Sequence, residues 1–465
     1  MNRQNISREN YQTYVWFRQA AERGDAYAQF NLGLMYKKGD CIERDYARAF
    51  TWLRQAALQG LAFAQNHLGA LYYNGRGVAK SDAEAAYWFR HAAEQGDASA
   101  QQNLGQMYKK GRGLEHNPEL ALAWFYRAAE QGVASAQGLL AECYLHGHGA
   151  PLNYPLAMAW YRKAAVQGDA QAQLNLGLMY KRGQGVQANP AQALCWFRQS
   201  AAQGNAMAQR QLGVAYAEGL GVRADPLRAF AWLQRAAEQG EKDAQFNLGV
   251  MLANGQGVDK DEARALAWYL RSAEQGHMLA QYNLGSMYAH GRGVTRDELR
   301  ALEWYRRAAD QGAPNAQFNL GVIYATGQGV PRDEVQAAFW YRIAADQGDA
   351  SAQNNLGVMY ANGQGMQQDD TMAVFWYTQA AEQGHALAQY NLGGMYGSGR
   401  GVQRDQVRAY MWMLLAAEAG DATASANKGI VARRLTPAEI GSALNLSRQW
   451  QVHHKANSVS CRASS

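Results

Sequence analysis

The sequence predicts an all-α protein, a solenoid built from 36-residue helix-loop-helix repeats. Twelve of its 13 tryptophans lie 36 residues apart, from Trp16 to Trp412. Glycines keep the same interval from Gly24 to Gly420. Within each interval, apolar residues recur every three or four positions, which is the period of a helix with one buried face.

The repeat at residues 97–132 shows why the first helix forms and where it ends. Ala100, Leu104 and Tyr108 are four residues apart, so they lie on one face of a helix. The Gly-Arg-Gly segment at 111–113 then ends the helix, because glycine adopts the left-handed C-terminal conformation without a steric penalty.

A capping residue begins the second helix of each repeat. Asn117 is followed by proline, which suits the first helical position because its missing N–H would have no partner there. Trp124 and Ala128 lie on the buried face of this helix, which ends at Gly132. The equivalent N-cap positions hold only Asp, Asn or Ser: Asp45, Ser81, Asn117, Asn153, Asn189, Asp225, Asp261, Asp297, Asp333, Asp369 and Asp405.

Neighbouring repeats are predicted to stack into a continuous core, because a pair of short helices cannot bury its apolar faces alone. The glycine after each first-helix leucine, such as Gly105, allows two helix backbones to approach closely. Each tryptophan is expected to fill the wedge between neighbouring repeats. Truncating one to alanine should then cost about 3–5 kcal/mol.

The repeat pattern also sets the domain boundaries. Residues 25–420 hold eleven tandem repeats, and residues 1–24 are expected to form an N-terminal half-repeat or cap. Residues 421–453 are expected to form a C-terminal half-repeat and a capping helix, which begins at the capping box of residues 436–439. The small and polar residues 454–465 are predicted to be a disordered tail.

One repeat carries a complete family pattern in Ala280, Leu284, Gly285, Tyr288, Gly291, Gly293, Val294, Asp297, Ala301, Trp304, Ala308, Ala309 and Gly312. This pattern resembles the Sel-1-like repeat, a 36-residue relative of the tetratricopeptide repeat. The resemblance covers residues 11 to about 434. It implies a right-handed α/α superhelix that serves as an adaptor in bacterial or eukaryotic complexes, including signalling and host-contact roles.

Composition and the chain ends narrow the function. The formal charge of +6 over 465 residues is mild for a nucleic-acid-binding protein, and the four cysteines follow no common spacing. The first residues contain no apolar signal-peptide core, and no apolar run is long enough to cross a membrane. We therefore expect a cytoplasmic protein, or a periplasmic or secreted one if the true start lies upstream of Met1.

No residue set predicts catalysis. The Gly-x-Gly loops lie between helices and recur in every repeat, so they indicate turns instead of a phosphate site. His146 with His148, and His453 with His454, have no third ligand at a metal-site spacing. We predict a non-catalytic protein with no metal and no cofactor.

The positions that the repeat leaves variable suggest a binding surface. In a solenoid of this kind the first helices line the concave groove, and an aromatic column and an asparagine column run along them. Aromatic rings could hold the side chains of an extended peptide while the amides hold its backbone. Packing between repeats is the alternative role for both columns. The predicted protein- or peptide-binding residues are Phe246, Asn247, Tyr282, Asn283, Phe318, Asn319, Asn355, Tyr390 and Asn391.

Lysines end the first helices of several early repeats, at Lys37, Lys109 and Lys181. They either complement the helix dipole or make the N-terminal half a site for an acidic partner. The leading hypothesis is a scaffold that binds a protein or peptide, and nucleic-acid binding through this basic half is the less favoured alternative. A secreted or periplasmic factor that binds a host protein is the further alternative. The sequence sets neither the partner's identity nor the oligomeric state.

Overall fold

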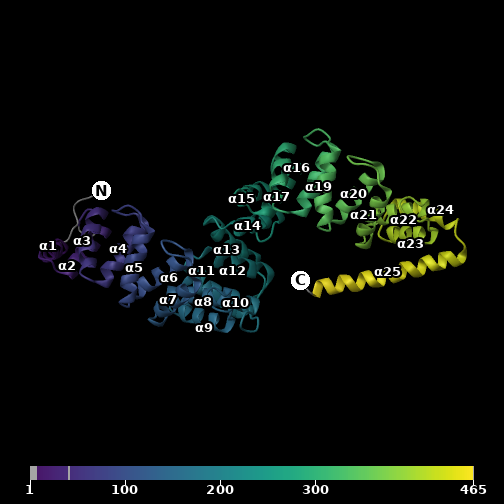
Figure 1. Cartoon of the computed structure of the whole chain (residues 1–465). Coiled ribbons are helices and arrows are strands. Elements are labelled where there is room, and N and C mark those ends of the chain that lie inside the picture. The colour runs from purple at the N-terminus through teal and green to yellow at the C-terminus, as the bar shows by residue number, and fades with distance from the viewer. Residues whose placement is uncertain (1–7, 40–41, 464–465) are drawn as a thin grey trace. The chain divides into compact units, whose positions relative to one another are not determined.

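The computed structural model describes residues 8–39 and 42–463, with side chains for residues 11–39 and 42–454. These residues form 25 helices and the turns between them, with no strand, so the all-α prediction is confirmed (Figure 1). The first helices of the repeats are α2 (Ala26–Lys38), α4 (Ala62–Asn74), α6 (Ala98–Lys110), α8 (Ala134–His146), α10 (Ala170–Arg182), α12 (Ala206–Glu218), α14 (Lys242–Asn254), α16 (Met278–His290), α18 (Pro314–Thr326), α20 (Ala350–Asn362), α22 (Ala386–Ser398) and α24 (Ala422–Ala432).

The second helices alternate with them along the chain, and a longer helix follows at the end. They are α1 (Arg8–Glu22), α3 (Tyr46–Leu58), α5 (Asp82–Glu94), α7 (Pro118–Glu130), α9 (Tyr154–Val166), α11 (Pro190–Ala202), α13 (Pro226–Glu238), α15 (Glu262–Glu274), α17 (Glu298–Asp310), α19 (Glu334–Asp346), α21 (Asp370–Glu382), α23 (Gln406–Glu418) and finally α25 (Pro437–Ala463).

The helices divide into two compact units, an N-terminal unit of residues Met1–Ala236 and a C-terminal unit of residues Ala237–Ser465. Within each unit, a first helix packs against the second helix of its own repeat and against the second helix of the repeat before it. The repeats therefore share one layered core inside each unit, as the stacking argument predicts.

The predicted caps and glycines hold the helix ends in place. Each of the eleven N-cap side chains accepts a hydrogen bond from a backbone N–H three residues later, as Asn117 does from Leu120 at 2.8 Å. Gly113 has a φ of +66°, and a Cβ there would lie 2.1 Å from the carbonyl oxygen of Asp82. That loop position therefore accepts only glycine.

Close approach also explains the glycine within each first helix. A Cβ on Gly105 would lie 2.7 Å from the ring of Phe125 in the second helix of the same repeat. Because this glycine leaves space, the large second-helix side chain fits under the first helix. This side chain then forms the base of the space between that first helix and the next one.

The tryptophans pack against the Ala-Ala pairs of the preceding repeats, so the wedge prediction is confirmed. Trp88, for example, joins the core cluster of Ala56 and Ala57. Trp16 differs, with 62% of its surface exposed, because no described helix precedes α1. At the other end, Trp412 is only 7% exposed, and the indole of Trp450 in α25 lies against it at 6.1 Å between ring centroids.

The C-terminal end differs in part from the prediction. The capping box is confirmed, because Thr436 N–H donates to Glu439 Oε2 at 2.7 Å and Glu439 N–H donates to Thr436 Oγ1 at 3.3 Å. α25 continues as helix to Ala463, beyond residue 453, where the sequence analysis places the end of the capping helix and the start of the tail. Residues 464 and 465 of that predicted tail lie outside the described residues.

A glutamine network that the sequence analysis missed joins each repeat to the next. Gln29 Nε2 donates to the carbonyl oxygen of Ala21 at 3.2 Å, and Gln59 Nε2 donates to Gln29 Oε1 at 2.8 Å. The same pair of bonds recurs in both units, for example at Gln281 and Gln311. A buried amide needs such partners, so the network fixes the spacing of successive repeats.

Candidate functional site

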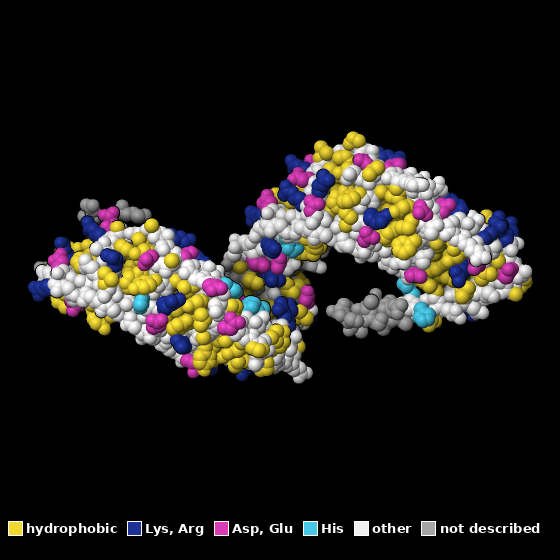
Figure 2. Space-filling view, viewed as in Figure 1, with side chains coloured by type: hydrophobic (Ala, Val, Ile, Leu, Met, Phe, Trp, Pro, Cys, Tyr) yellow, Lys and Arg dark blue, Asp and Glu magenta, His cyan; other side chains and the backbone are white. Residues whose placement is uncertain are grey.

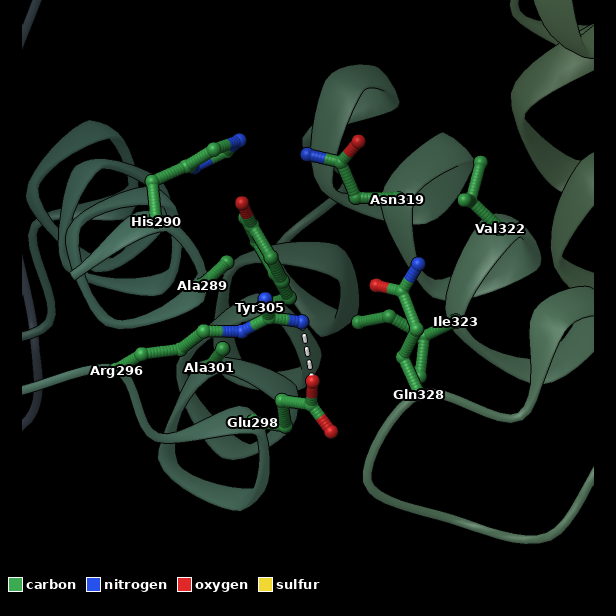
Figure 3. A pocket seen from close by; sticks show the side chains of 10 residues that line it. All are labelled: Ala289, His290, Arg296, Glu298, Ala301, Tyr305, Asn319, Val322, Ile323 and Gln328. Carbon is green, nitrogen blue, oxygen red and sulfur yellow. Dashed lines mark hydrogen bonds and ion pairs between the residues drawn. The ribbon is translucent and has the colours of Figure 1, made fainter.

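The variable positions of the repeats meet in spaces between successive first helices, which we call notches. The base of each notch is the large second-helix side chain that lies under the first-helix glycine. Figure 3 shows the notch between α16 and α18, a cavity of about 340 Å³. Tyr305 forms its base, and the Tyr305 hydroxyl points toward the space between His290 and Asn319. At one edge, Arg296 forms an ion pair with Glu298.

The notch of the next repeat has the same construction. It measures about 170 Å³, and Tyr341, Asn355 and Val358 line it at the positions of Tyr305, Asn319 and Val322. Arg332 and Glu334 repeat the ion pair at the edge. Two successive repeats of the C-terminal unit therefore offer equivalent sites with an aromatic base and an amide wall.

The N-terminal unit has notches at corresponding positions, with more varied chemistry. Phe89 and Asn103 line a cavity of about 290 Å³. Tyr161 and Asn175 line another of about 250 Å³ and repeat the tyrosine and asparagine of the C-terminal notches. Phe197 and Lys181 line a third of about 260 Å³.

Burial controls the chemistry of the tyrosine bases. It raises the pKa of Tyr269 and of Tyr305 to about 12, and the nearby amides of Asn283 and Asn319 partly offset this effect. The phenols therefore stay protonated at neutral pH. Each can donate or accept one hydrogen bond, but none is poised as a base.

The predicted aromatic residues lie on first helices of the C-terminal unit and are half-buried. Phe246 stacks on His277 at 4.5 Å and leans against Tyr269 at 5.8 Å, measured between ring centroids. Tyr282 and Phe318 lie at the same 5.8 Å from the tyrosine bases of their own repeats. Each ring thus covers one side of a buried tyrosine and leaves part of its own surface accessible.

The predicted asparagines are half-buried as well, and some already have partners within the protein. Asn391 Nδ2 donates to Asn354 Oδ1 at 3.0 Å on the preceding first helix. Asn319 and Asn355 line the two notches described above. Asn247 and Asn283 lie at the repeat position of Asn319. Tyr390 lies at the repeat position of Phe246, and its Oη accepts a hydrogen bond from Asn427 Nδ2 at 3.0 Å.

The sequence analysis missed the notch bases, although a signal for them exists. Every tyrosine at this second-helix position is followed 14 residues later by an asparagine. The pairs are Tyr161 and Asn175, Tyr269 and Asn283, Tyr305 and Asn319, Tyr341 and Asn355, and Tyr377 and Asn391. A phenylalanine or leucine at the base is not always followed by asparagine at this spacing, since Leu139 lies 14 residues after Phe125.

The lysines of the early repeats have three different partners on the next first helix. Lys109 Nζ forms an ion pair with Glu142 at 2.9 Å. Lys37 Nζ lies 3.0 Å from His67 Nδ1, and burial together with Lys37 lowers the pKa of His67 to about 4. Lys181 Nζ donates to Gln211 Oε1 at 3.1 Å.

Charges are mixed over the face drawn in Figure 2, where lysine and arginine side chains alternate with aspartate and glutamate in both units. No helix of the described part of the chain has the length and apolarity that a membrane span requires. Among the same residues, no three His, Cys, Asp or Glu side chains come together as a possible metal site.

Comparison with known proteins links this arrangement to one family. The Sel1 repeat model matches residues 4–25, 26–61, 62–97, 98–133, 134–169, 170–205, 206–241, 242–277, 279–312, 314–349, 350–385 and 386–421. No curated protein matches the chain by sequence.

Two solved structures are similar over long stretches. One is c5321, described as a protective antigen present in uropathogenic Escherichia coli strains displaying an SLR fold. It is 38% identical with a TM-score of 0.80, over 96% of this chain and 94% of that one. The other is a Sel1 repeat protein from Oxalobacter formigenes, 36% identical with a TM-score of 0.52, over 66% of this chain and 89% of that one.

Proposed function

Because the chain belongs to the Sel1 repeat family, we propose that it is an adaptor that binds a protein or peptide along the first helices of its C-terminal unit. The fold suits a protein-interaction scaffold, since stacked repeats present one long surface whose side chains vary while the core repeats. The observation that carries the proposal is the run of half-buried aromatic rings beside two equivalent notches.

Each notch can hold one side chain of an extended partner. Tyr305 and Asn319 offer a hydroxyl and an amide that donate and accept, and Val322 supplies apolar contact. Phe246, Tyr282 and Phe318 add accessible aromatic surface next to the polar groups. Aromatic residues are enriched in protein-binding interfaces relative to the rest of a protein surface.

The same surface supports a non-catalytic role. The tyrosines that it holds are kept protonated by burial, and the ion pair of Arg296 with Glu298 already satisfies both charges. Neither is arranged as a base next to a nucleophile, which acid–base or covalent catalysis requires.

The relative from uropathogenic Escherichia coli supports a setting for this binding. That protein is described as a protective antigen of uropathogenic strains. We propose by analogy with that protein a bacterial host-interaction role for the present chain, with the partner a protein of the host or of the bacterium. The location of the chain is part of the same proposal. A cytoplasmic location suits a bacterial partner, and a periplasmic or secreted location suits a host protein.

The test compares the wild type with a triple alanine variant and a double alanine control in crosslinking pull-downs from bacterial and host-cell extracts. Phe246→Ala, Tyr282→Ala and Phe318→Ala together should abolish capture of the partner that the wild type retains. Phe339→Ala with Phe375→Ala is the matched control, since these rings are exposed on second helices of the same unit. Circular dichroism should show equal helicity in all proteins, and capture by the first variant at the wild-type level would contradict the proposal.

A further inference from the structure

The notch between α10 and α12 in the N-terminal unit combines an apolar cavity with a cation. It measures about 260 Å³, with Phe197 as its base and Leu194 and Leu220 among its walls. Lys181 and Gln211 are its hydrogen-bonding side chains. Phe197 is buried directly under the α10 backbone, since a Cβ on Gly177 would lie 2.5 Å from its ring.

The ammonium group of Lys181 is not neutralised by an ion pair there. Its hydrogen bond to Gln211 Oε1 is partly buried, and the acceptor is an uncharged amide. Among the described residues, no carboxylate lies within ion-pair distance of Lys181. Burial lowers the pKa of Lys181, against an opposing effect of Glu218 and with further lowering by Arg210 and Arg182. Lys181 is an exposed residue at the edge of the notch, so an anion can reach its ammonium group from solvent, and a bound anion would supply the counter-charge that this cation lacks.

The equivalent lysine two repeats earlier is neutralised by a carboxylate of the protein itself. Lys109 occupies the same helix position and forms its ion pair with Glu142 at 2.9 Å. Two repeats on from Glu142 the chain carries Val214. The protein thus supplies the counter-charge at one notch and an apolar side chain at the other.

From these observations we propose that the α10–α12 notch binds the carboxy-terminal residue of a partner peptide. The apolar side chain of that residue enters the cavity over Phe197, and its terminal carboxylate accepts hydrogen bonds from Lys181 Nζ. The Gln211 amide has donors for the second carboxylate oxygen. Backbone and side chain are recognised together, so a peptide that ends in leucine fits and an internal leucine does not.

This site lies outside the C-terminal unit to which the adaptor function is assigned, so the two proposals stand separately. The Phe246, Tyr282 and Phe318 triple-alanine variant should bind a carboxy-terminal peptide like the wild type. A protein that loses one activity and keeps the other tells the two sites apart.

The experiment measures binding of synthetic peptides to the full chain by calorimetry. The probe is an acetylated hexapeptide that ends in Ala-Ala-Leu with a free carboxylate, titrated up to about 1 mM. The same peptide with an amidated end should bind at least about tenfold more weakly, because one charge-assisted hydrogen bond is lost. N-acetylleucine tests whether a free acid alone is sufficient.

Variants locate the effect. Lys181→Gln should lower affinity about tenfold, and Val214→Glu should do the same by supplying the counter-charge that Glu142 gives to Lys109. Lys109→Gln is the matched control and should leave affinity unchanged. Equal binding of the free and amidated peptides, no binding of either, or wild-type affinity in Lys181→Gln would overturn the site. N-acetylleucine binding as tightly as the peptide would overturn its assignment to a peptide terminus.

Discussion

The notches of the two units are built on one backbone pattern but carry different side chains. In the N-terminal unit the base is phenylalanine or leucine in every repeat except at Tyr161, and three lysines stand at the edge. In the C-terminal unit the bases from Tyr269 to Tyr377 are all tyrosine, each with its asparagine, and alanine replaces the edge lysine, as at Ala253.

This difference shows that scaffold and surface vary independently. The first-helix glycine, the glutamine pairs and the tryptophan wedges recur in both units and set the spacing of the helices. The first-helix glycine leaves space for phenylalanine, leucine or tyrosine beneath it, as Gly105, Gly213 and Gly249 show. The base and the walls of a notch are therefore free to carry other chemistry. The two units can therefore hold different ligands on the same framework.

The largest expected effect tests whether the scaffold is indeed shared. Trp160→Ala in the N-terminal unit and Trp340→Ala in the C-terminal unit should each destabilise the surrounding repeats by about 3–5 kcal/mol, since both indoles are buried. Hydrogen exchange of the neighbouring helices measures the loss. Trp16→Ala is the control and should cost less than about 0.5 kcal/mol, because that side chain is mostly exposed. A large loss in one unit only would break the comparison.

The second largest loss of stability is expected from substitutions that break the glutamine network. Gln101→Leu and Gln281→Leu should each cost about 1–3 kcal/mol, because each removes two hydrogen bonds, one accepted from a following glutamine and one donated to a buried carbonyl oxygen. That carbonyl oxygen keeps the backbone N–H of Gly96 or Gly276 as a donor. Urea denaturation followed by circular dichroism measures the change. Gln379→Leu, at an exposed position, should be neutral, and equal effects at all three sites would refute a structural role for the network.

Acid should weaken the first helices of the C-terminal unit that histidine caps. His277 Nδ1 accepts the Ala280 N–H at 3.1 Å, and burial lowers the pKa of His277 from 6.5, with Asp243 opposing and Lys242 adding to the effect. Protonation is thus easier in the unfolded chain, so the cap contributes above pH 6.5 and its contribution falls as the pH drops below 6.5. We expect a local loss of up to about 1 kcal/mol at pH 5.

Hydrogen exchange at the start of α16, corrected for the intrinsic rate, measures that loss. The start of α12 in the N-terminal unit is the internal control, because its cap, Asn205, carries an amide that does not titrate. His277→Asn should keep the cap and remove the pH response. Equal acid sensitivity of α12 and α16, or an unchanged response in the variant, would contradict the assignment.

The smallest loss of stability is expected from a substitution that converts one kind of notch into the other. Tyr305→Phe gives the C-terminal unit the base found at Phe197 and removes the hydroxyl beside the Asn319 amide. The fold should lose about 1 kcal/mol or less, because the ring and its packing remain. Thermal denaturation measures the loss, and the amide resonance of Asn319 should shift. A loss as large as that of a tryptophan truncation would mean that the hydroxyl belongs to the scaffold.

Local chemistry explains why the helices could be predicted from sequence. The caps act within three residues, and the glycines that end the helices act through their own backbone angles. The exception is α25, whose extension beyond His453 was missed. No glycine or proline follows Gly441 to end that helix, and the ring of His454 stacks on Trp450 at 4.6 Å.

The candidate site was predictable only in part. The aromatic and asparagine columns follow from the helical period, since the residues recur at 36-residue spacing. Their degree of burial did not follow, because it depends on the tyrosine of the second helix underneath. The 14-residue spacing of tyrosine and asparagine was visible, but its meaning requires knowing that the two side chains face the same notch.

The sequence alone therefore determined the period, the helix ends and the residues that form the core, because caps, glycines and apolar stripes act over a few residues. The tertiary structure alone decided which cations have a counter-charge. Lys109 meets Glu142 and Lys181 meets Gln211 at separations of 33 and 30 residues. Contacts at that range depend on how one repeat stacks on the next, and local sequence patterns do not predict that stacking geometry.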